Sequence, residues 1–485
     1  MASPFSALRW VLFGSIGFRI LSFGGQMLIL RLVEKDSFGA YRAIVQLHLI
    51  FLTLLPLGLD TLVVREKKFL KRYVAGTAGM LGIVGSVLAF AALLLALVPN
   101  PGSGSLLSRW MSLEEDGLAL LLMPLIFAVQ SAKLAIRSRH NAELNFRRIS
   151  LGELGNGLIT WLGGAIIVLV FPKAWALLGV YLLGELFEAI WFYRREPFRL
   201  GLSLGMRGWR IAWRLLQKHR AYCLFNTADM TLNNLASLIP GVLFAALISK
   251  AATADFAVAS QVLVLPTMLM AGALWRVAFP SLSGLAEADL QRRCLSIISS
   301  ASAFIAPSVL WFAVFASSNV YLLGGEEYME TAAPLVRWMG LYMVMVAVFN
   351  PISSLDMIRN RPEVGLVWNI FYTIGRVILV FTFASDGLLA TVAALAIFSA
   401  AAWVVQIAIF NWLLGAGTGR FIHAFAPLLI PQALLLLGYT ACLHLTNSHL
   451  LYSPLASLIP TALYMGIIWR FFPEQSAILH RLFKR

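Results

Sequence analysis

Charged residues are scarce in this sequence. Asp, Glu, Lys and Arg make up 13% of its 485 residues, whereas hydrophobic residues make up 60%. An ordinary soluble domain carries about 25% charged residues. This composition argues against a soluble core and indicates a chain whose solvent is largely the lipid bilayer.

Cysteines and catalytic motifs are scarce as well. Cys223, Cys294 and Cys442 lie far apart and form neither a CxxC pair nor a His/Cys cluster with metal-ligand spacing, so a disulfide framework or a metal site is not expected. The sequence contains no HExxH or P-loop pattern, and its one GxSxG match, Gly201 to Gly205, lies in a basic connection between apolar runs, which argues against a hydrolase and an ATP-driven pump. We expect no cofactor, and coupling to Na⁺ or H⁺ stays open.

Apolar runs of about 20 residues, the length that crosses a hydrocarbon core, recur from Val11 almost to Phe472. They predict an all-α polytopic membrane protein with about fourteen transmembrane helices. The first run is expected to be a retained helix, because only Arg9 precedes it and no small-residue cleavage site follows. The expected spans are 10–30, 37–58, 76–98, 117–136, 150–171, 174–193, 221–248, 254–279, 296–315, 333–353, 364–384, 388–412, 426–446 and 454–472.

Basic residues are distributed unevenly between the two sides that these spans define. With a cytoplasmic N-terminus, the opposite side carries few of them, namely Arg31, Lys35, Arg109, Lys173 and Lys250. The cytoplasmic side carries the clusters at 65–72, 137–148, 292–293 and 359–361, with Arg420, Lys484 and Arg485. The positive-inside rule therefore predicts that both termini are cytoplasmic, in a bacterial inner membrane. It also accounts for the net charge of +15 without nucleic acid as a partner.

The longest basic connection precedes residue 221. Its cations lie at helical spacing, with Trp209, Trp213 and Leu216 on other faces; they are Arg207, Arg210, Arg214 and Lys218. This pattern predicts an interfacial amphipathic helix. It serves either as a basic linker that obeys the positive-inside rule or as a contact for anionic lipid.

The linker separates two sets of six spans. The expected domains are an N-terminal six-helix lobe at 1–200, the linker at 201–220, a C-terminal six-helix lobe at 221–412, and appended helices 13 and 14 with a basic tail at 413–485. Because six is even, the lobes would be pseudo-symmetric parallel repeats. The equal-length connectors Arg31 to Phe38 and Ser249 to Phe256 support this, since each has an acidic residue two positions before its Phe.

Several short patterns occur in a recognisable order along the chain. They are Arg31-Leu32-Val33, Phe38-Gly39-Ala40-Tyr41 and Gly58-Leu59-Asp60, then Leu323-Gly324-Gly325-Glu326-Glu327-Tyr328, Ala332-Ala333-Pro334 and Arg359-Asn360-Arg361. In this the chain resembles the Wzx-type polysaccharide flippases of the multidrug/oligosaccharidyl-lipid/polysaccharide (MOP) exporter superfamily. The resemblance implies two six-helix lobes around a central cavity lined by the first two helices of each lobe. It also implies a polyprenyl-pyrophosphate-linked oligosaccharide as substrate, carried to the periplasmic leaflet by alternating access, with a polysaccharide polymerase or ligase as a possible partner.

Three of the helices that this resemblance assigns to the cavity carry a polar stripe. In the first span, Ser15, Arg19, Ser22 and Gln26 are spaced by four, three and four residues, which places them on one face. The second span has a similar set, Arg42, Gln46, Thr53 and Asp60. The seventh has Tyr222, Asn226, Asp229, Asn233 and Ser237.

Arginine within a span suggests a binding role. A lipid-facing arginine at a helix centre costs about 2.5 to 3.5 kcal/mol on insertion scales, so Arg19 should face protein or water. We hypothesise that Arg19, Arg42 and Arg276 bind the pyrophosphate, because a guanidinium donates two hydrogen bonds and stays charged. The same cavity would be lined by Gln26, Gln46, Asn226 and Asn233. The alternatives are a structural ion pair or a snorkelling side chain.

Asp229 is the most embedded carboxylate on a polar stripe and is our first candidate for an ion-coupling site. Oxygen donors suited to a hard cation would come from Asn369, Thr373 and Thr391. The alternative is a hydrogen bond that only packs helices. Glu185 and Glu188 of the sixth span are equally able to titrate and rank second.

Three other functions remain open. A drug exporter on the same fold would favour acidic and aromatic cavity residues, whereas the first span offers Arg19. A peptidoglycan-precursor flippase would share the cavity chemistry and differ in the headgroup. A membrane-embedded glycosyltransferase, ligase or polymerase would need larger outer loops than 99–116 and 317–331.

Overall fold

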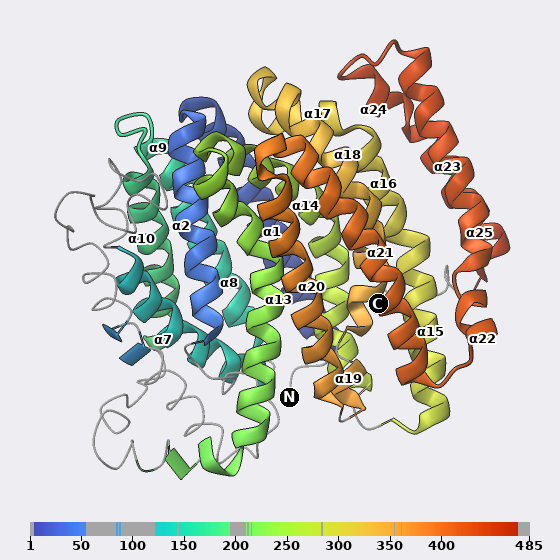
Figure 1. Cartoon of the computed structure of the whole chain (residues 1–485), viewed down its shortest axis with the longest axis horizontal. Coiled ribbons are helices and arrows are strands. Elements are labelled where there is room, and N and C mark those ends of the chain that lie inside the picture. Colours follow the sequence, from blue (N-terminus) through green and yellow to red (C-terminus); the bar gives the residue numbers. More distant parts are fainter. Residues whose placement is uncertain are drawn as a thin grey trace. The chain divides into compact units, whose positions relative to one another are not determined.

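The structure of the chain is a computed structural model, shown in Figure 1. It describes residues 4–54, 84–85, 87–88, 122–142, 145–194, 210, 213–214, 216–282, 285–353, 355–359 and 361–473. In these ranges the chain is helical and has no strand, which confirms the expected all-α fold. The helices divide into two compact units, Met1–Ala254 with Asn369–Ser385, and Asp255–Trp368 with Asp386–Arg485.

The first unit contains long helices from the N-terminal half of the chain. They are α1 (Pro4–Leu32), α2 (Lys35–Leu54), α7 (Met123–Ala142), α8 (Phe146–Gly157), α10 (Ala174–Tyr193) and α13 (Arg220–Leu247). A π-helical segment, η1 (Leu158–Gly163), and the short α9 (Gly164–Ile167) continue α8. Two further helices belong to this unit in part, α14 (Lys250–Leu282) by its start and α20 (Pro362–Phe383) by its second half.

Small residues bring the helices of this unit close together. α1 packs along α8, and α2 packs along α13. A methyl group at Gly14 would lie 2.5 Å from Ser150 Cβ, and one at Gly17 would lie 2.6 Å from Leu154. Glycine is therefore required where α1 and α8 touch, as is common between helices in a membrane.

The second unit is built from the C-terminal half of the chain. Its helices are α15 (Glu287–Phe304), α16 (Ala306–Val314), α17 (Ala316–Gly324), α18 (Glu326–Phe349), η2 (Asn350–Ile352), α19 (Leu355–Ile358), α21 (Leu388–Leu414), α22 (Thr418–His423), α23 (Ala426–Leu445), α24 (Tyr452–Ala456) and α25 (Leu458–Phe471). The short η3 (Ala384–Asp386) precedes α21. α18 packs against α16, α17 and α21, which forms the centre of this unit.

The last two long helices, α23 and α25, pack on α15 and α16 through hydrogen bonds as well as apolar contacts. Gln432 donates to the Ser302 carbonyl at 2.7 Å, and Tyr464 donates to the Ala303 carbonyl at 2.8 Å. Tyr439, which is 1% exposed, lies in the apolar cluster between them. The helices expected at 426–446 and 454–472 are thus docked on the second unit.

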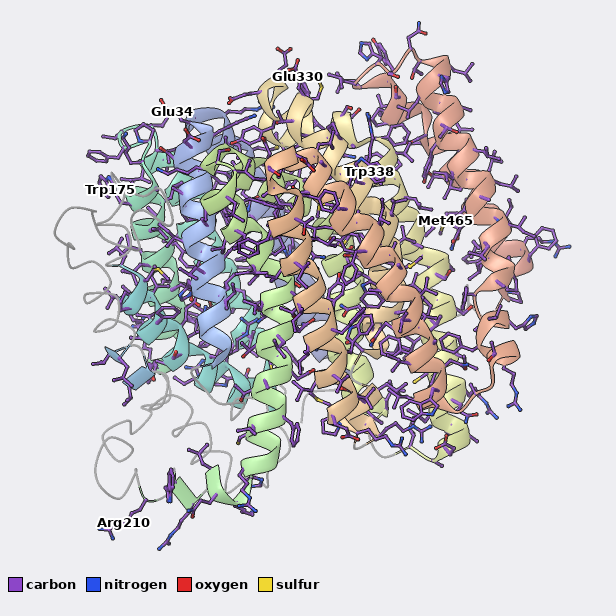
Figure 2. All side chains as sticks on the ribbon, in the orientation of Figure 1. Glu34, Trp175, Arg210, Glu330, Trp338 and Met465 are labelled. Atoms are coloured by element: carbon purple, nitrogen blue, oxygen red, sulfur yellow. The ribbon has the colours of Figure 1, made fainter. Side chains whose placement is uncertain are left out.

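Seven helices among the described residues are long and apolar enough to cross a membrane. They are Ala174–Tyr193, Cys223–Leu247, Glu287–Val314, Glu326–Ile358, Pro362–Asp386, Leu388–Leu414 and Thr418–Leu445. Their outward side chains are largely apolar, and Figure 2 labels one of them, Trp338 on α18. The length and apolar composition of these helices indicate a multi-pass membrane protein.

The expected spans agree with the helices to different degrees. The span 174–193 coincides with α10, whereas 76–98 lies almost entirely outside the described residues. A single helix over 296–315 was expected, but the chain is already helical from Glu287 and is interrupted at Ile305, because Pro307 has no N–H to donate. The total of about fourteen helices and the domain boundaries at 200, 220 and 412 stay predictions.

The connectors of the expected repeat are shorter than predicted. Only Val33 and Glu34 separate α1 from α2, and only Ile248 and Ser249 separate α13 from α14. The helix starts take up the remaining residues, since α2 already begins at Lys35, with Asp36 in its first turn, and α14 begins at Lys250. Figure 2 shows Glu34 and Trp175 toward one end of the first unit and Arg210 toward the other. The amphipathic linker helix falls largely outside the described residues, although Arg210, Trp213 and Arg214 are helical and exposed.

Candidate functional site

The polar stripe of α1 faces away from the outer surface of the first unit. Arg19 is half-buried midway along the helix, and Ser22 and Gln26 are buried. The Gln26 amide donates to Ser22 Oγ at 3.4 Å. Ile20 and Leu28, on other faces of α1, are 67% and 50% exposed. The four- and three-residue spacing therefore gives the helix one polar, inward face.

Arg42 and Gln46 lie one turn apart on α2, where that helix packs on α13. A methyl group at Gly241 would be 2.1 Å from Gln46 Oε1, so the amide lies directly against the α13 backbone. Arg42 is half-buried. Its Nε and Gln46 Oε1 are buried and have no hydrogen-bond partner among the described residues.

Unsatisfied buried polar atoms are unusual and require an explanation. The Arg42 guanidinium can donate only, and Gln46 Oε1 can accept only. A ligand that supplies an anionic oxygen to Arg42 and a hydroxyl to Gln46 would satisfy both atoms. A phosphorylated sugar has both of these groups.

Asp229 lies at a contact between α13 and α20. Asn369 Nδ2 donates to Asp229 Oδ1 at 2.7 Å, and Thr373 Oγ1 donates to the Leu232 carbonyl at 2.9 Å. The structure thus brings three of the four residues expected at the ion site together. Thr391 belongs to the second unit, and its hydroxyl donates to the Gly387 carbonyl one turn earlier at 2.8 Å.

The other predicted site residues are less informative. Asn233 is exposed on α13, and its carbonyl accepts from Ser237. Arg276 and Asn226 lie on α14 and α13, but their side chains fall outside the described part of the structure, as do those of Thr53 and Asp60.

Sequence reasoning missed a polar face on α7. Gln130, Lys133 and Arg137 are spaced by three and four residues, which places them on one side of that helix. This side is turned toward α8 and α10, on which α7 packs. The face carries a row of charged and amide contacts through the interior of the first unit.

Lys133 is the centre of this row. Its ammonium group bridges two carboxylates of α10, binding Glu185 Oε2 and, at 2.9 Å, Glu188 Oε2. Lys133, Glu185 and Glu188 are 8%, 4% and 1% exposed. Charges buried to this degree are stable only when they are paired and hydrogen-bonded.

Asn156 of α8 binds the same two carboxylates. Its Nδ2 donates to Glu185 Oε1 at 3.0 Å and to Glu188 Oε2 at 2.8 Å. Its Oδ1 accepts from Thr160, at 2.8 Å, and Thr160 lies in the π-helical segment η1. A continuous α-helix was expected over 150–171. The observed wider turn is typical of functional sites in helices.

Gly184 allows α10 to approach this segment. A methyl group there would be 2.1 Å from Thr160 Oγ1 and 2.6 Å from Asn156 Oδ1. A larger residue at position 184 would therefore have to displace the side chains of Thr160 and Asn156. The backbone of α10 therefore contacts the network directly.

Two further contacts extend the row along α7. Arg137 forms an ion pair with Glu153 of α8. In the other direction, Gln130 Oε1 contacts His48 Nε2 at 2.7 Å, and Gln130 Nε2 donates to Tyr181 at 2.6 Å. One face of α7 thus makes polar contacts with α2, α8 and α10.

The sequence contained a signal for this network. Glu185 and Glu188 were recognised as titratable, and Lys133 lies within the expected span 117–136, where a charged residue marks a functional or paired position. The partner could not be identified, because the contact joins residues that are 52 and 55 positions apart.

Two solved structures define the class of fold. The lipid II flippase MurJ in an inward closed conformation has a TM-score of 0.70 at 13% identity, with 98% of this chain and 100% of that chain covered. An inward-facing multidrug resistance MATE transporter of the MOP superfamily has a TM-score of 0.56 at 15% identity, with 86% and 96% covered. The chain therefore has the fold of the MOP transporters.

Sequence comparison gives the family. Residues 28–333 match the model described as "Polysaccharide biosynthesis protein". An uncharacterised membrane protein in the cps region of Klebsiella pneumoniae is 22% identical over 74% of this chain and 72% of its own length. The lipopolysaccharide biosynthesis protein WzxC of Escherichia coli K12 is 22% identical over 54% and 53%. The chain belongs to the polysaccharide biosynthesis protein family.

Proposed function

We propose that this protein is a flippase that carries a polyprenyl-pyrophosphate-linked oligosaccharide from the cytoplasmic to the periplasmic leaflet by alternating access. The observation that carries the proposal is the pair of buried, unsatisfied polar atoms on α2, Arg42 Nε and Gln46 Oε1. An anionic phosphate oxygen and a sugar hydroxyl are the groups that would satisfy them. Membership in a polysaccharide biosynthesis family supports the same substrate class.

Arg19 of α1 provides a second cation for the headgroup. It lies midway along α1 on the inward polar face. Two arginines suit a pyrophosphate better than a cationic drug, because drug binding would favour carboxylates. The related peptidoglycan-precursor flippase would use the same chemistry on a different sugar.

The test is leaflet transfer of a fluorescent polyprenyl-pyrophosphate oligosaccharide in proteoliposomes, with Arg42→Ala and Arg42→Lys beside the unchanged protein. A charge-assisted hydrogen bond contributes about 1.5 to 3 kcal/mol. We therefore expect Arg42→Ala to slow transfer about tenfold or more, and Arg42→Lys to recover part of the rate. Arg194→Ala is the matched control, because Arg194 is exposed at the end of α10. Equal rates for all four proteins would contradict the role of Arg42.

We also propose that the protein lies in the bacterial inner membrane with both termini in the cytoplasm, as the positive-inside rule predicts. Reporter fusions at each terminus test this orientation, and a periplasmic signal from either terminus would contradict it. A polysaccharide polymerase or ligase would then consume the oligosaccharide on the outer side.

An ion gradient is the proposed source of energy. Asp229, which Asn369 binds at 2.7 Å, remains the proposed Na⁺ or H⁺ site on α13. Asp229→Asn keeps the size of the side chain and removes its charge, so it should abolish stimulation by the ion gradient. Unchanged stimulation would exclude Asp229 from coupling.

A further inference from the structure

A groove with a volume of 290 Å³ lies on the surface of α18 in the second unit. Pro334, Arg337, Trp338 and Leu341 line it. These residues come from successive turns of one helix, and Figure 2 shows Trp338 farther along that helix than Glu330. Trp338 is 37% and Leu341 52% exposed, and Arg337 is exposed beside them. The groove therefore opens on the side of α18 that faces lipid in a membrane.

An arginine on this lipid-facing side is the unusual feature of the groove. Arg337 lies within Glu326–Ile358, a helical stretch that is long and apolar enough to cross a membrane. A charged side chain in such a position is costly unless its charge is compensated. Arg337 Nη2 donates to Ser317 Oγ of α17 at 2.9 Å. This bond satisfies one donor, but a neutral hydroxyl does not compensate the positive charge.

The described part of the chain offers Arg337 no carboxylate. None of the ion pairs among the described residues includes it. Residues 333–341, one turn to each side on α18, contain no acidic side chain. Glu330 is seven residues earlier, which is about 10 Å along the helix axis. Because a guanidinium has five N–H donors, most of the donors and the full charge remain for a group outside the chain.

The side chain of Arg337 is directed toward the end of the helix and away from the bilayer centre. α17 ends at Gly324 and α18 begins at Glu326, so these packed helices are antiparallel. Ser317 is eight residues before Gly325 and Arg337 is twelve after it, so the guanidinium reaches about 6 Å toward the turn. Arginines in spanning helices extend in this way to the level of the lipid headgroups.

We infer that the groove binds the phosphate of an anionic phospholipid, with Arg337 as the residue that binds it. The planar guanidinium can donate two hydrogen bonds to phosphate oxygens. An acyl chain of the same lipid would lie along Trp338 and Leu341, and the indole N–H suits the headgroup level. An anionic headgroup fits better than a zwitterionic one, because a zwitterionic headgroup carries a cation of its own.

The leaflet of this lipid follows from the orientation proposed above. With the N-terminus in the cytoplasm, α18 begins on the periplasmic side, so the groove would take a lipid of the periplasmic leaflet. Lipid binding itself depends neither on that orientation nor on the proposed flippase function.

The experiment is native mass spectrometry of the purified full-length protein during titration with dioleoylphosphatidylglycerol or dioleoylphosphatidylcholine. We expect the first phosphatidylglycerol to bind more tightly than the first phosphatidylcholine. Arg337→Gln should weaken binding of phosphatidylglycerol about tenfold or more. Arg337→Lys should recover part of the affinity, because lysine keeps the charge but not the planar fork. Lys173→Gln removes one exposed cation before α10 and is the matched control, with unchanged affinity.

Ser317→Ala separates lipid binding from helix packing. If Arg337 only holds α18 to α17, loss of the hydroxyl should have the same effect as loss of the guanidinium. Lipid binding predicts instead that Ser317→Ala retains its affinity for phosphatidylglycerol, because the charge of Arg337 is still present. Thermal unfolding in lipid-free detergent shows whether each variant is folded. If Arg337→Gln does not fold, the test rests on Arg337→Lys, which should bind phosphatidylglycerol more weakly than the unchanged protein.

Three results would overturn the inference. They are equal affinity of Arg337→Gln and the unchanged protein for phosphatidylglycerol, equally tight binding of phosphatidylcholine, and equal losses of affinity in Ser317→Ala and Arg337→Gln. Because no lipid-linked oligosaccharide is present in the titration, failure of the flippase proposal would leave these results unchanged.

Discussion

Replacing Lys133 by Met should destabilise the first unit more than any ordinary surface substitution. The side chains of Lys133, Glu185 and Glu188 are only 10%, 5% and 2% exposed, and the ammonium group makes a hydrogen bond to each carboxylate. A hydrogen bond to a charged group contributes about 1.5 to 3 kcal/mol, and removal of one partner from a buried ion pair costs about 3 to 5 kcal/mol. Asn156 still donates to both carboxylates in the variant. We therefore expect Lys133→Met to lower the free energy of unfolding by about 3 to 5 kcal/mol in total.

The assay is unfolding by SDS in mixed micelles, followed by tryptophan fluorescence at constant protein concentration. Lys173→Met is the matched control, because Lys173 is exposed before α10, and it should lie within about 0.5 kcal/mol of the unchanged protein. The triple variant Lys133→Met, Glu185→Gln, Glu188→Gln removes the buried charges with the lysine and should recover most of the loss. Destabilisation of less than about 1 kcal/mol at neutral pH, or no recovery in the triple variant, would refute the reasoning.

Two further predictions concern helix packing. Gly39→Ala should destabilise more than Gly241→Ala, because the new methyl at Gly39 would lie 1.9 Å from the backbone carbonyl of Lys250, whereas at Gly241 it meets a side chain that can move. We expect Gly39→Ala to lower the free energy of unfolding by about 1 to 3 kcal/mol or more, measured from the same SDS unfolding curves. Equal losses of stability in Gly39→Ala and Gly241→Ala would contradict the packing described. Thr331→Val removes the hydroxyl that donates to Asp255 at 2.7 Å and should cost about 1 to 3 kcal/mol, whereas an unchanged unfolding midpoint would show that this bond contributes nothing.

The helices could be predicted from the sequence because the bilayer requires long apolar segments. The ends of α10 were predicted at Ala174 and Tyr193, because Lys173 and Arg194 flank a largely apolar segment. The π-helical turn at η1 could not be predicted, since it depends on the close contact of Thr160 with Gly184. The interruption at Ile305 follows from Pro307, which an apolar-run criterion ignores.

The candidate site was only partly predictable. Spacing alone placed Arg19, Ser22 and Gln26 on one face, and that face is turned inward. Asp229 and Asn369, 140 residues apart, were proposed together and do form a hydrogen bond. Lys133 was overlooked because hydropathy treats it as one charge near a helix end, whereas its role depends on carboxylates from another helix.

The most direct test of the central claim is lipid transfer by the unchanged protein itself. Proteoliposomes with and without the protein would be loaded in one leaflet with a fluorescent polyprenyl-pyrophosphate oligosaccharide, and its appearance in the other leaflet would be followed by quenching. The account predicts transfer that requires the protein and falls about tenfold or more in Arg42→Ala. Transfer of a cationic dye with no movement of the pyrophosphate-linked lipid would contradict it.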